Sequence, residues 1–503
     1  MPPGWAGEDG LIMKKRIFAL VLAGVILAFG LPGCGQGQES SAKLDSSMPV
    51  SLTVWHYYNG SQQAAFDALV AEFNAGVGKE QGIYVEGYSQ GSIGDLEQAI
   101  SNSAANAVGS LPLPDIFSTY ADTAYALQQQ GLLADLTAYF SQDELKEYVP
   151  GYIQEGLFQD DGALYLFPVA KSTEILMLNA TDWEPFAQST GTTLEELDTT
   201  EGITEVARRY YQWTDDQTPD IPDDGKAFYG RDSMSNYFLI GMKQMGIDLF
   251  DVTGGQVTLR TDKEQIRRLW DNYYVPYVSG WFLRLGKFRS DDVKTGDLLA
   301  YTGSTSSAMY FPDQVVGDKE SYPISCIVRP APIMEGGQRI YVQQGADMAV
   351  TRSDAQREYA ACQFLRWFTA KQNNLRFVCE SAYLPVRIDA NSMEAMDQVI
   401  SEKGLNVSSK TYHCLETVLD SFAQIDFYTP KCFVNGYTAR KVLDYNLCDR
   451  AEADKAAIDA LVAQGVSRAE ATAPYLTDAA FDSWYGDFCQ ALEKATAPQT
   501  QIQ

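Results

Sequence analysis

The run Trp55-His56-Tyr57-Tyr58 places four ring side chains in a row, where a predicted strand gives way to a helix. Catalysis by His56 as a general base would require a nucleophile and an orienting partner, and the sequence indicates neither. A tyrosine ring with its hydroxyl matches both the flat C–H face and the polar rim of a pyranose. We therefore interpret His56, Tyr57, Tyr58 and Asn59 as candidates for ligand contact. The alternative is packing of some of these rings against the following helix, and Trp55, which belongs to the strand, is expected in the core.

Sequence motifs for catalysis and for cofactors give no support to an enzyme. The chain contains no HExxH, P-loop, GxGxxG or CxxC pattern, and its two histidines lie far apart. A glycosidase needs only two carboxylates, but the 66 Asp and Glu residues single out no pair. The sequence therefore predicts a protein that is not an enzyme and takes no cofactor or metal.

The charge balance argues against nucleic acid as a partner. The chain has 38 Lys and Arg residues against 66 Asp and Glu residues, a formal net charge of −28, whereas contacts to phosphate need clustered cations. Aromatic residues make up 12% of the chain and include 29 tyrosines, so many rings must lie near the surface or in a groove. A length of 503 residues predicts two or three domains.

The N-terminal segment predicts export. A basic stretch that begins at Met13 precedes an apolar run over residues 17–30. This run is shorter than the roughly 20 residues of a membrane-spanning helix and fits a secretory signal. Translation is expected to begin near Met13, and residues 1–33 form the predicted signal peptide.

A lipid anchor is expected directly after this segment. The sequence LPGC at 31–34 resembles the bacterial lipobox, in which Cys34 would receive a diacylglycerol and become the new N-terminus. Pro32 departs from the small residue that is usual at its position. Residues 34–49 are typical of a flexible tether. The mature protein is thus expected on the outer face of the bacterial cytoplasmic membrane. Seven further cysteines cannot all pair within one chain. They are compatible both with free thiols and with disulfides between some of them.

The elements after the tether alternate between strand and helix. A strand is expected at 51–55 and a helix after it, because Phe66, Leu69, Val70 and Phe73 follow the spacing of one buried helical face. Further strands are expected at 82–88 and 114–117, with helices at 92–108 and near 121–130. Alternation of this kind predicts a parallel sheet with helices on both faces.

The ends of these strands predict where a ligand would bind. In open parallel sheets, ligands bind beyond the carboxyl ends of the strands, so the loops after 51–55 and 114–117 should face a crevice. Ser118 and Tyr120 follow the third strand and are candidates for this reason. The N-terminus of the next helix offers free N–H groups there, and capping of that helix is the alternative role.

Several segments together resemble the extracellular solute-binding proteins of ABC importers, family 1, which includes sugar and glycerol-phosphate receptors. The resemblance is carried by residues 52–74, by LPDIFSTYADTAYALQQQGLLADLTAYF at 111–140, by DDGALYLFPVAKSTEILMLN at 160–179, and by the stretch from QQGADMAV to AYLPVR at 343–387. Leu178 departs from the Tyr that is commoner at its position. In their order and spacing the motifs cover roughly residues 50–445.

The resemblance implies an α/β, two-lobed periplasmic-binding-protein-like fold. Each lobe would be a mostly parallel sheet with helices on both faces, and a hinged cleft would lie between them. The first lobe would comprise 50–170 plus about 333–370. The second would comprise about 174–330 plus 372–490, with a tail at 491–503.

The resemblance also implies further site residues. Lys171 and Ser172 lie in the expected first crossing segment, where Lys171 is either solvated or directed into the cleft. The segment VNGYTARKVLDYNL at 434–447 resembles a late helix whose first turn faces the cleft in maltose-type members. Those members carry a stacking Trp where this chain has Gly436, which puts a maltodextrin-like ligand in doubt. The remaining candidates are Tyr310, Gln344, Gly345, Tyr437 and Arg440, together with Tyr383 and Arg387 beside LPV.

The function implied is that of a lipid-anchored receptor that binds a sugar or sugar-like molecule and delivers it to an ABC permease. The alternatives are a secreted carbohydrate-active enzyme and a ligand sensor for a membrane kinase. The abundant aromatic residues favour a saccharide, whereas Lys171 and Arg440 leave room for a sugar phosphate or glycerol phosphate.

Overall fold

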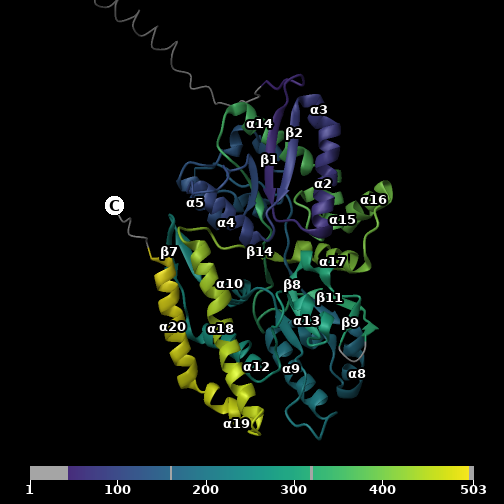
Figure 1. Ribbon diagram of the computed structural model, residues 1–503, viewed down its shortest axis with the longest axis vertical. Coiled ribbons are helices and arrows are strands. Elements are labelled where there is room, and N and C mark those ends of the chain that lie inside the picture. The colour runs from purple at the N-terminus through teal and green to yellow at the C-terminus, as the bar shows by residue number, and fades with distance from the viewer. Residues whose placement is uncertain (1–42, 159–160, 318–320, 498–503) are drawn as a thin grey trace, which may run out of the picture. The chain divides into compact units, whose positions relative to one another are not determined.

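Two four-stranded sheets organise the part of the chain that the structure describes (Figure 1). The computed structural model describes residues 43–158, 161–317 and 321–497, which belong to one compact unit. The expected signal peptide and Cys34 lie outside the described residues, as do the last residues of the expected tail.

The first sheet is built around three parallel strands. In sheet order its strands are β13 (Asp347–Val350), β3 (Ile116–Thr119), β1 (Val50–His56) and β2 (Ile83–Ser89). β1 runs parallel to both of its neighbours, whereas β13 returns antiparallel to β3. Because β1 and β3 are parallel, the loops that follow His56 and Thr119 leave the same edge of the sheet.

Alternate residues of this sheet face two different layers of helices. Val54 and Ile116 face one hydrophobic core, and Trp55 and Phe117 face another. The first core contains α2 (Gly60–Ala75), α14 (Ala355–Phe368) and α15 (Lys371–Ser381), and the second contains α4 (Ile93–Ala104) and α5 (Ala121–Gln129). The predicted apolar face of α2 is buried, so the helices on both faces of this sheet are confirmed.

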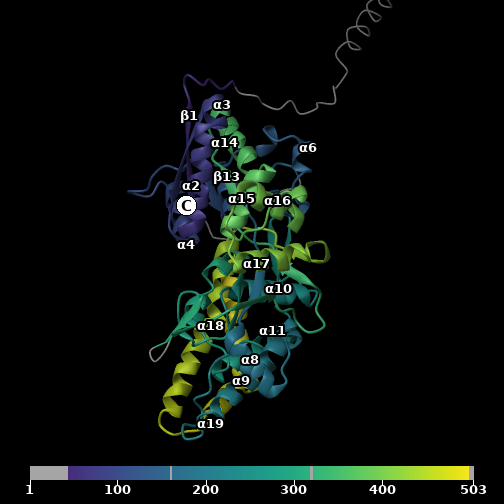
Figure 2. The same cartoon turned by 90° about the vertical axis from the view of Figure 1, so that its right-hand side faces the viewer.

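Helix α15 contributes to two cores. It lies alongside α2 (Figure 2), and its Phe377 ring lies 5.1 Å from the ring of Tyr58 in the first sheet's core. Its Leu375 packs in a separate core with residues of the second sheet. The sequence prediction assigned 372–490 to the second lobe, whereas this helix is shared between the two.

The second sheet is mixed. Its strands, in sheet order, are β11 (Cys326–Pro330), β4 (Glu174–Asn179), β8 (Ala300–Ser304) and β5 (Tyr229–Arg231). Only β5 and β8 are parallel, because β4 runs antiparallel to both β8 and β11. The α/β class is confirmed, but the expectation of a mostly parallel second sheet is wrong. β4 enters this sheet directly from the crossing segment, so no crossover helix sets its direction.

Helices, most of which carry aromatic residues, surround the second sheet. They are α8 (Ala180–Thr190), α9 (Thr200–Asp215), α10 (Met234–Gln244), α11 (Lys263–Asp271), α12 (Tyr274–Val278), α13 (Arg289–Thr295), α18 (Gly436–Val462) and α20 (Asp478–Thr496). The C-terminal helices α18 and α20 lie side by side (Figure 1). Rings from α11, α12 and α20 stack in the core, with Trp270 and Tyr274 only 3.7 Å apart between ring centroids.

Shorter elements complete the described chain. The short helices are α3 (Val77–Gln81), α6 (Gln142–Leu145), α7 (Pro150–Glu155) and α19 (Arg468–Thr472), and α16 (Met393–Lys403) and α17 (Ser409–Leu419) follow α15. Paired short strands are β6 (Phe250–Thr253) with β7 (Gln256–Leu259), β9 (Gln314–Val316) with β10 (Ser321–Pro323), and β12 (Ile340–Val342) with β14 (Asp426–Tyr428).

Segments that cross between the two sheets are hydrogen-bonded to one another. Ser172, just before β4, exchanges two backbone hydrogen bonds with Gln344, just before β13, at 2.8 and 3.0 Å. Lys171 likewise pairs with Leu384 after α15. The crossing segments therefore support one another instead of running as separate linkers.

Two further observations concern the cysteines and the membrane. The seven cysteines within the described ranges are all free thiols. None of the helices that the structure describes has the length and apolar character needed to span a bilayer.

Candidate ligand-binding site

Tyr57 lies where the first sheet meets a crossing segment. Its hydroxyl is 2.9 Å from the hydroxyl of Tyr383 and accepts a hydrogen bond from the backbone N–H of Ala346 at 3.4 Å. Burial, together with the nearby hydroxyls of Tyr383 and Tyr120, raises the pKa of Tyr57 well above its ordinary value. Three tyrosines thus gather beyond the carboxyl ends of β1 and β3, each a neutral group that can donate or accept a hydrogen bond.

His56 and Tyr58, by contrast, belong to the core. Both are buried, with 0% and 1% of their surface exposed. The His56 ring lies 4.6 Å from Phe66 and 5.1 Å from Tyr58 between centroids. Its Nδ1 accepts the backbone N–H of Tyr58 at 3.2 Å. The two side chains fit the packing role that the sequence left open. Asn59 is exposed and donates to the carbonyls of Tyr57 and Gly91 at 2.8 and 2.9 Å, which holds the loop.

One stretch matches a catalytic pattern without its geometry. Residues 87–91 read Gly-Tyr-Ser-Gln-Gly, which is the GxSxG pattern of hydrolase nucleophiles. Ser89 lies opposite His56 in the β1–β2 register, but its hydroxyl donates to the carbonyl of Tyr58 at 3.0 Å. The Nε2 atom of His56 has no hydrogen-bond partner among the described residues. Within the described ranges no acid is hydrogen-bonded to the histidine, so the pair does not form a triad.

The segment after β3 binds a carboxylate from α4. Ser118 and Thr119 are buried. Glu97 accepts hydrogen bonds from the hydroxyl of Thr119 at 3.1 Å and from the backbone N–H of Tyr120 at 3.0 Å. Burial raises the pKa of Glu97 despite these hydrogen bonds. The backbone N–H of Tyr120 therefore already has a hydrogen-bond acceptor in Glu97, whereas the Tyr120 side chain is partly exposed.

Lys171 forms a buried ionic cluster. Its ammonium lies 2.8 Å from Glu155 and 2.7 Å from Asp347, and it donates to the carbonyl of Gly345 at 3.3 Å. Burial opposes the charge of Lys171, but the two carboxylates outweigh it and raise its pKa. Burial raises the pKa of Asp347 to about 7 against the pull of Lys171. Lys171 is thus neither solvated nor free to meet a ligand, because its three donors are engaged.

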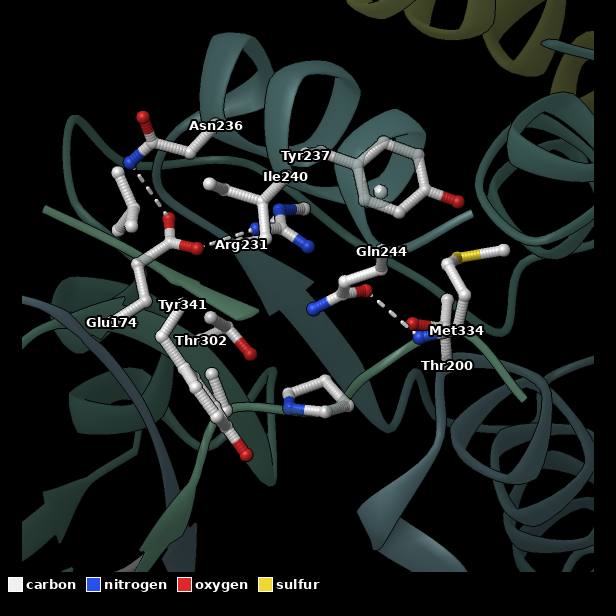
Figure 3. A pocket seen from close by; sticks show the side chains of 14 residues that line it. Glu174, Thr200, Arg231, Asn236, Tyr237, Ile240, Gln244, Thr302, Met334 and Tyr341 are labelled. Atoms are coloured by element: carbon white, nitrogen blue, oxygen red, sulfur yellow. Dashed lines mark hydrogen bonds and ion pairs between the residues drawn. The ribbon is translucent and has the colours of Figure 1, made fainter. Parts of the chain in front are cut away.

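A second polar network lies where β4 begins. Asn236 donates to Gln344 Oε1 at 2.9 Å and to Glu174 at 3.1 Å, and Arg231 pairs with Glu174 at 2.9 Å. Glu174, Arg231 and Asn236 are among the residues that line a narrow cavity of about 20 Å³ (Figure 3). A cavity of this size has room for about one water molecule and is too small for a saccharide. Gly345 has a φ of +98°, and a Cβ there would lie 2.8 Å from the carbonyl of Ala170, so its role is the close approach of two backbones.

The first turn of α18 meets α5. A Cβ on Gly436 would lie 2.3 Å from Oδ1 of Asp122. At the place where related receptors are expected to carry a stacking Trp, a larger residue would therefore have to displace this carboxylate. Arg440, one turn later, has its Nε 3.8 Å from Oδ2 of Asp122. Burial raises the pKa of Asp122 against the pull of Arg440. Tyr437 is partly exposed, and the ammonium of Lys441 lies 4.6 Å from its ring centroid.

The structure therefore brings together only part of the predicted set. Tyr57 interacts with Tyr383 and Tyr120, and Tyr120 interacts with Arg440. Asp122 lies beside both Arg440 and Gly436, whereas Tyr310 is half-exposed outside these contacts. The ligand role of every candidate stays a prediction. Sequence reasoning missed Glu97 and Asp122. The position of Asp122 two residues after Tyr120 was an available signal, whereas nothing in its own helix marks Glu97.

Comparisons with known proteins agree with this fold. A profile described as bacterial extracellular solute-binding protein matches residues 68–403, and no curated protein matches the chain. The cyclic α-maltosyl-1,6-maltose binding protein of Arthrobacter globiformis is 18% identical with a TM-score of 0.59, and the match covers 89% of this chain and 99% of that one. UgpB of Mycobacterium tuberculosis with glycerophosphocholine is 16% identical with a TM-score of 0.62, covering 89% and 98%. Lmo0181 of Listeria monocytogenes with cycloalternan is 14% identical with a TM-score of 0.61, covering 88% and 99%.

Proposed function

Because the chain belongs to the bacterial extracellular solute-binding protein family, we propose that it is a receptor that binds a saccharide and delivers it to an ABC permease. The family places the protein outside the cytoplasm. We further propose that a lipid on Cys34 holds it at the outer face of the cytoplasmic membrane. In this proposal the protein acts by binding and not by catalysis, which is supported by the names of two similar solved structures as binding proteins.

The observation that carries this proposal is the convergence of Tyr57 and Tyr120 with the first turn of α18. Tyr57 and Tyr120 follow β1 and β3 of the first sheet, whereas α18 packs in the core around the second sheet. A solute bound among them would contact both halves of the protein at once. Binding would therefore stabilise one arrangement of the halves, which is how occupancy can be signalled to a permease.

The chemistry of this place suits a sugar. The tyrosine rings offer flat apolar faces, and their hydroxyls, with the carboxylates nearby, offer acceptors for sugar hydroxyls. Related proteins include receptors for cyclic maltosides and for cycloalternan. The proposed solute is therefore a saccharide, part of which lies against the Tyr57 loop.

A thermal-shift screen of saccharides tests this function. We expect at least one mono- or oligosaccharide to raise the melting temperature by several degrees at about 100 times its Kd, because a ligand that binds only the folded protein adds about 2.7 kcal/mol at that concentration. We expect the saccharide to be recovered unchanged by chromatography.

Two tyrosine variants locate the effect. In Tyr57→Ala the shift should be largely lost, because the ring beyond β1 is removed. In Tyr84→Ala it should persist, because Tyr84 is an exposed tyrosine on the edge strand β2. Consumption of a glycan with no shift by any intact saccharide would contradict the receptor function and favour an enzyme.

A further inference from the structure

Carboxylates dominate the charges around Tyr120. Burial raises the pKa of Tyr120 to about 12; the nearby acids Glu97, Asp444 and Glu155 add to this rise, and Arg440 opposes it. Asp122 adds a further carboxylate, because it interacts with both Arg440 and Glu155. These acids come from α4, α5, α7 and α18, so the excess of negative charge is produced by the tertiary fold and not by one acidic stretch.

The cations at this place already have partners. Arg440 lies 3.8 Å from Asp122. Lys171 is enclosed by Glu155 and Asp347 at 2.8 and 2.7 Å. An anionic ligand that approached Lys171 would have to displace a carboxylate that is 1–7% exposed. Such a displacement would leave that carboxylate buried without its partner.

Gly436 keeps Arg440 and Asp122 together. Because position 436 has no side chain, the first turn of α18 approaches α5 until the carboxylate of Asp122 occupies the space where a Cβ would point. A phosphate group on a sugar would need the guanidinium of Arg440 as its cation. The Asp122 carboxylate already occupies the space beside that guanidinium. A phosphate monoester carries a charge of about −2 near neutral pH. It would meet the carboxylates of Glu97, Asp122, Glu155 and Asp444, and the cations beside them already pair with Asp122 and Glu155.

We infer that this site selects an uncharged, hydroxyl-rich saccharide and rejects phosphorylated sugars and glycerol phosphates, an inference that rests on the function proposed above. Sugar hydroxyls can donate to carboxylates, which only accept hydrogen bonds when ionised. The same carboxylates repel a phosphate and offer it no donor. The charge of the site thus resolves the two solute classes that the sequence left open.

Calorimetric titration at low ionic strength tests this inference, because salt would screen the charges. The probes are glycerol 3-phosphate, and glucose beside glucose 6-phosphate. The wild-type protein should bind each phosphate ester at least about tenfold more weakly than the Asp122→Asn variant does. That variant removes the carboxylate that holds Arg440 and lowers the negative charge. Asp143→Asn is the matched control, because Asp143 pairs with Lys146 on the surface, with 91% of its side chain exposed; it should bind the esters as weakly as the wild type does.

Two outcomes would overturn the inference in different ways. If the wild-type protein bound glycerol 3-phosphate as tightly as Asp122→Asn, the selectivity would be refuted while the receptor function still stood. If no saccharide and no phosphate ester bound to either protein, both the selectivity and the receptor function would be refuted.

Discussion

Replacement of Lys171 by methionine is expected to lower the free energy of unfolding by about 3–5 kcal/mol, the usual effect of breaking a buried ion pair. The Lys171 side chain is fully buried, and Glu155 and Asp347 beside it are 7% and 1% exposed. Methionine fills a similar volume but leaves two buried carboxyl groups without a cation. These groups must then either stay protonated or carry an unpaired buried charge at a high cost in free energy. Denaturant unfolding monitored by circular dichroism measures the change.

Lys146→Met is the matched control for this prediction. Lys146 forms one ion pair with Asp143, and 73% of its side chain is exposed, so its loss should leave the unfolding curve nearly unchanged. Lys171→Arg, which keeps the charge, should be less damaging than Lys171→Met and provides a folded variant if the methionine protein fails to fold. A Lys171→Met protein of unaltered stability that no longer bound its solute would show that the lysine serves the ligand.

Acid is expected to weaken the protein through His56 by about 3 kcal/mol between pH 6.5 and 4. Burial lowers the pKa of His56 from 6.5 to about 4. Between these pH values the unfolded chain binds a proton at His56 that the folded chain does not bind. The contribution of His56 to the free energy of unfolding is therefore fully present above pH 6.5 and is lost as the pH falls towards 4. Protonation would also remove the Nδ1 acceptor from the N–H of Tyr58. Unfolding curves at several pH values measure this slope.

The two histidines of the chain provide their own control. In His56→Asn the amide oxygen can still accept the Tyr58 N–H, and this part of the pH dependence should disappear while the protein becomes less stable at pH 7. His413 is exposed on α17, so His413→Asn should retain the wild-type slope. Equal slopes for wild type and His56→Asn would mean that His56 is not held neutral in the folded protein.

Local patterns were sufficient for the first sheet. The spacing of Phe66, Leu69, Val70 and Phe73 predicted the buried face of α2, and the alternation of strands and helices predicted the parallel pairing of β1 with β2 and β3. The family resemblance, which rested on the order of several weak motifs, is confirmed by the matched profile.

Contacts between distant segments set the features that the sequence did not reveal. Lys171 looked solvated or directed at a ligand because its partners, Glu155 and Asp347, lie 16 and 176 positions away in the chain. The acids around Tyr120 come from four helices, and only Asp122 is marked by its position in the sequence, two residues after Tyr120. The antiparallel course of β4 follows from its entry through the crossing segment. Gly436 could be recognised as an unusual residue, but only the structure shows that a larger residue there would meet the Asp122 carboxylate.

A crystal structure of the protein with the saccharide that gives the largest thermal shift would locate the binding site. We expect electron density for the sugar between the loops of Tyr57 and Tyr120 on one side and the first turn of α18 on the other, with the Asp122–Arg440 pair intact. Density confined to another surface, such as the outer face of β2 around Tyr84, would show that the proposed site is wrong.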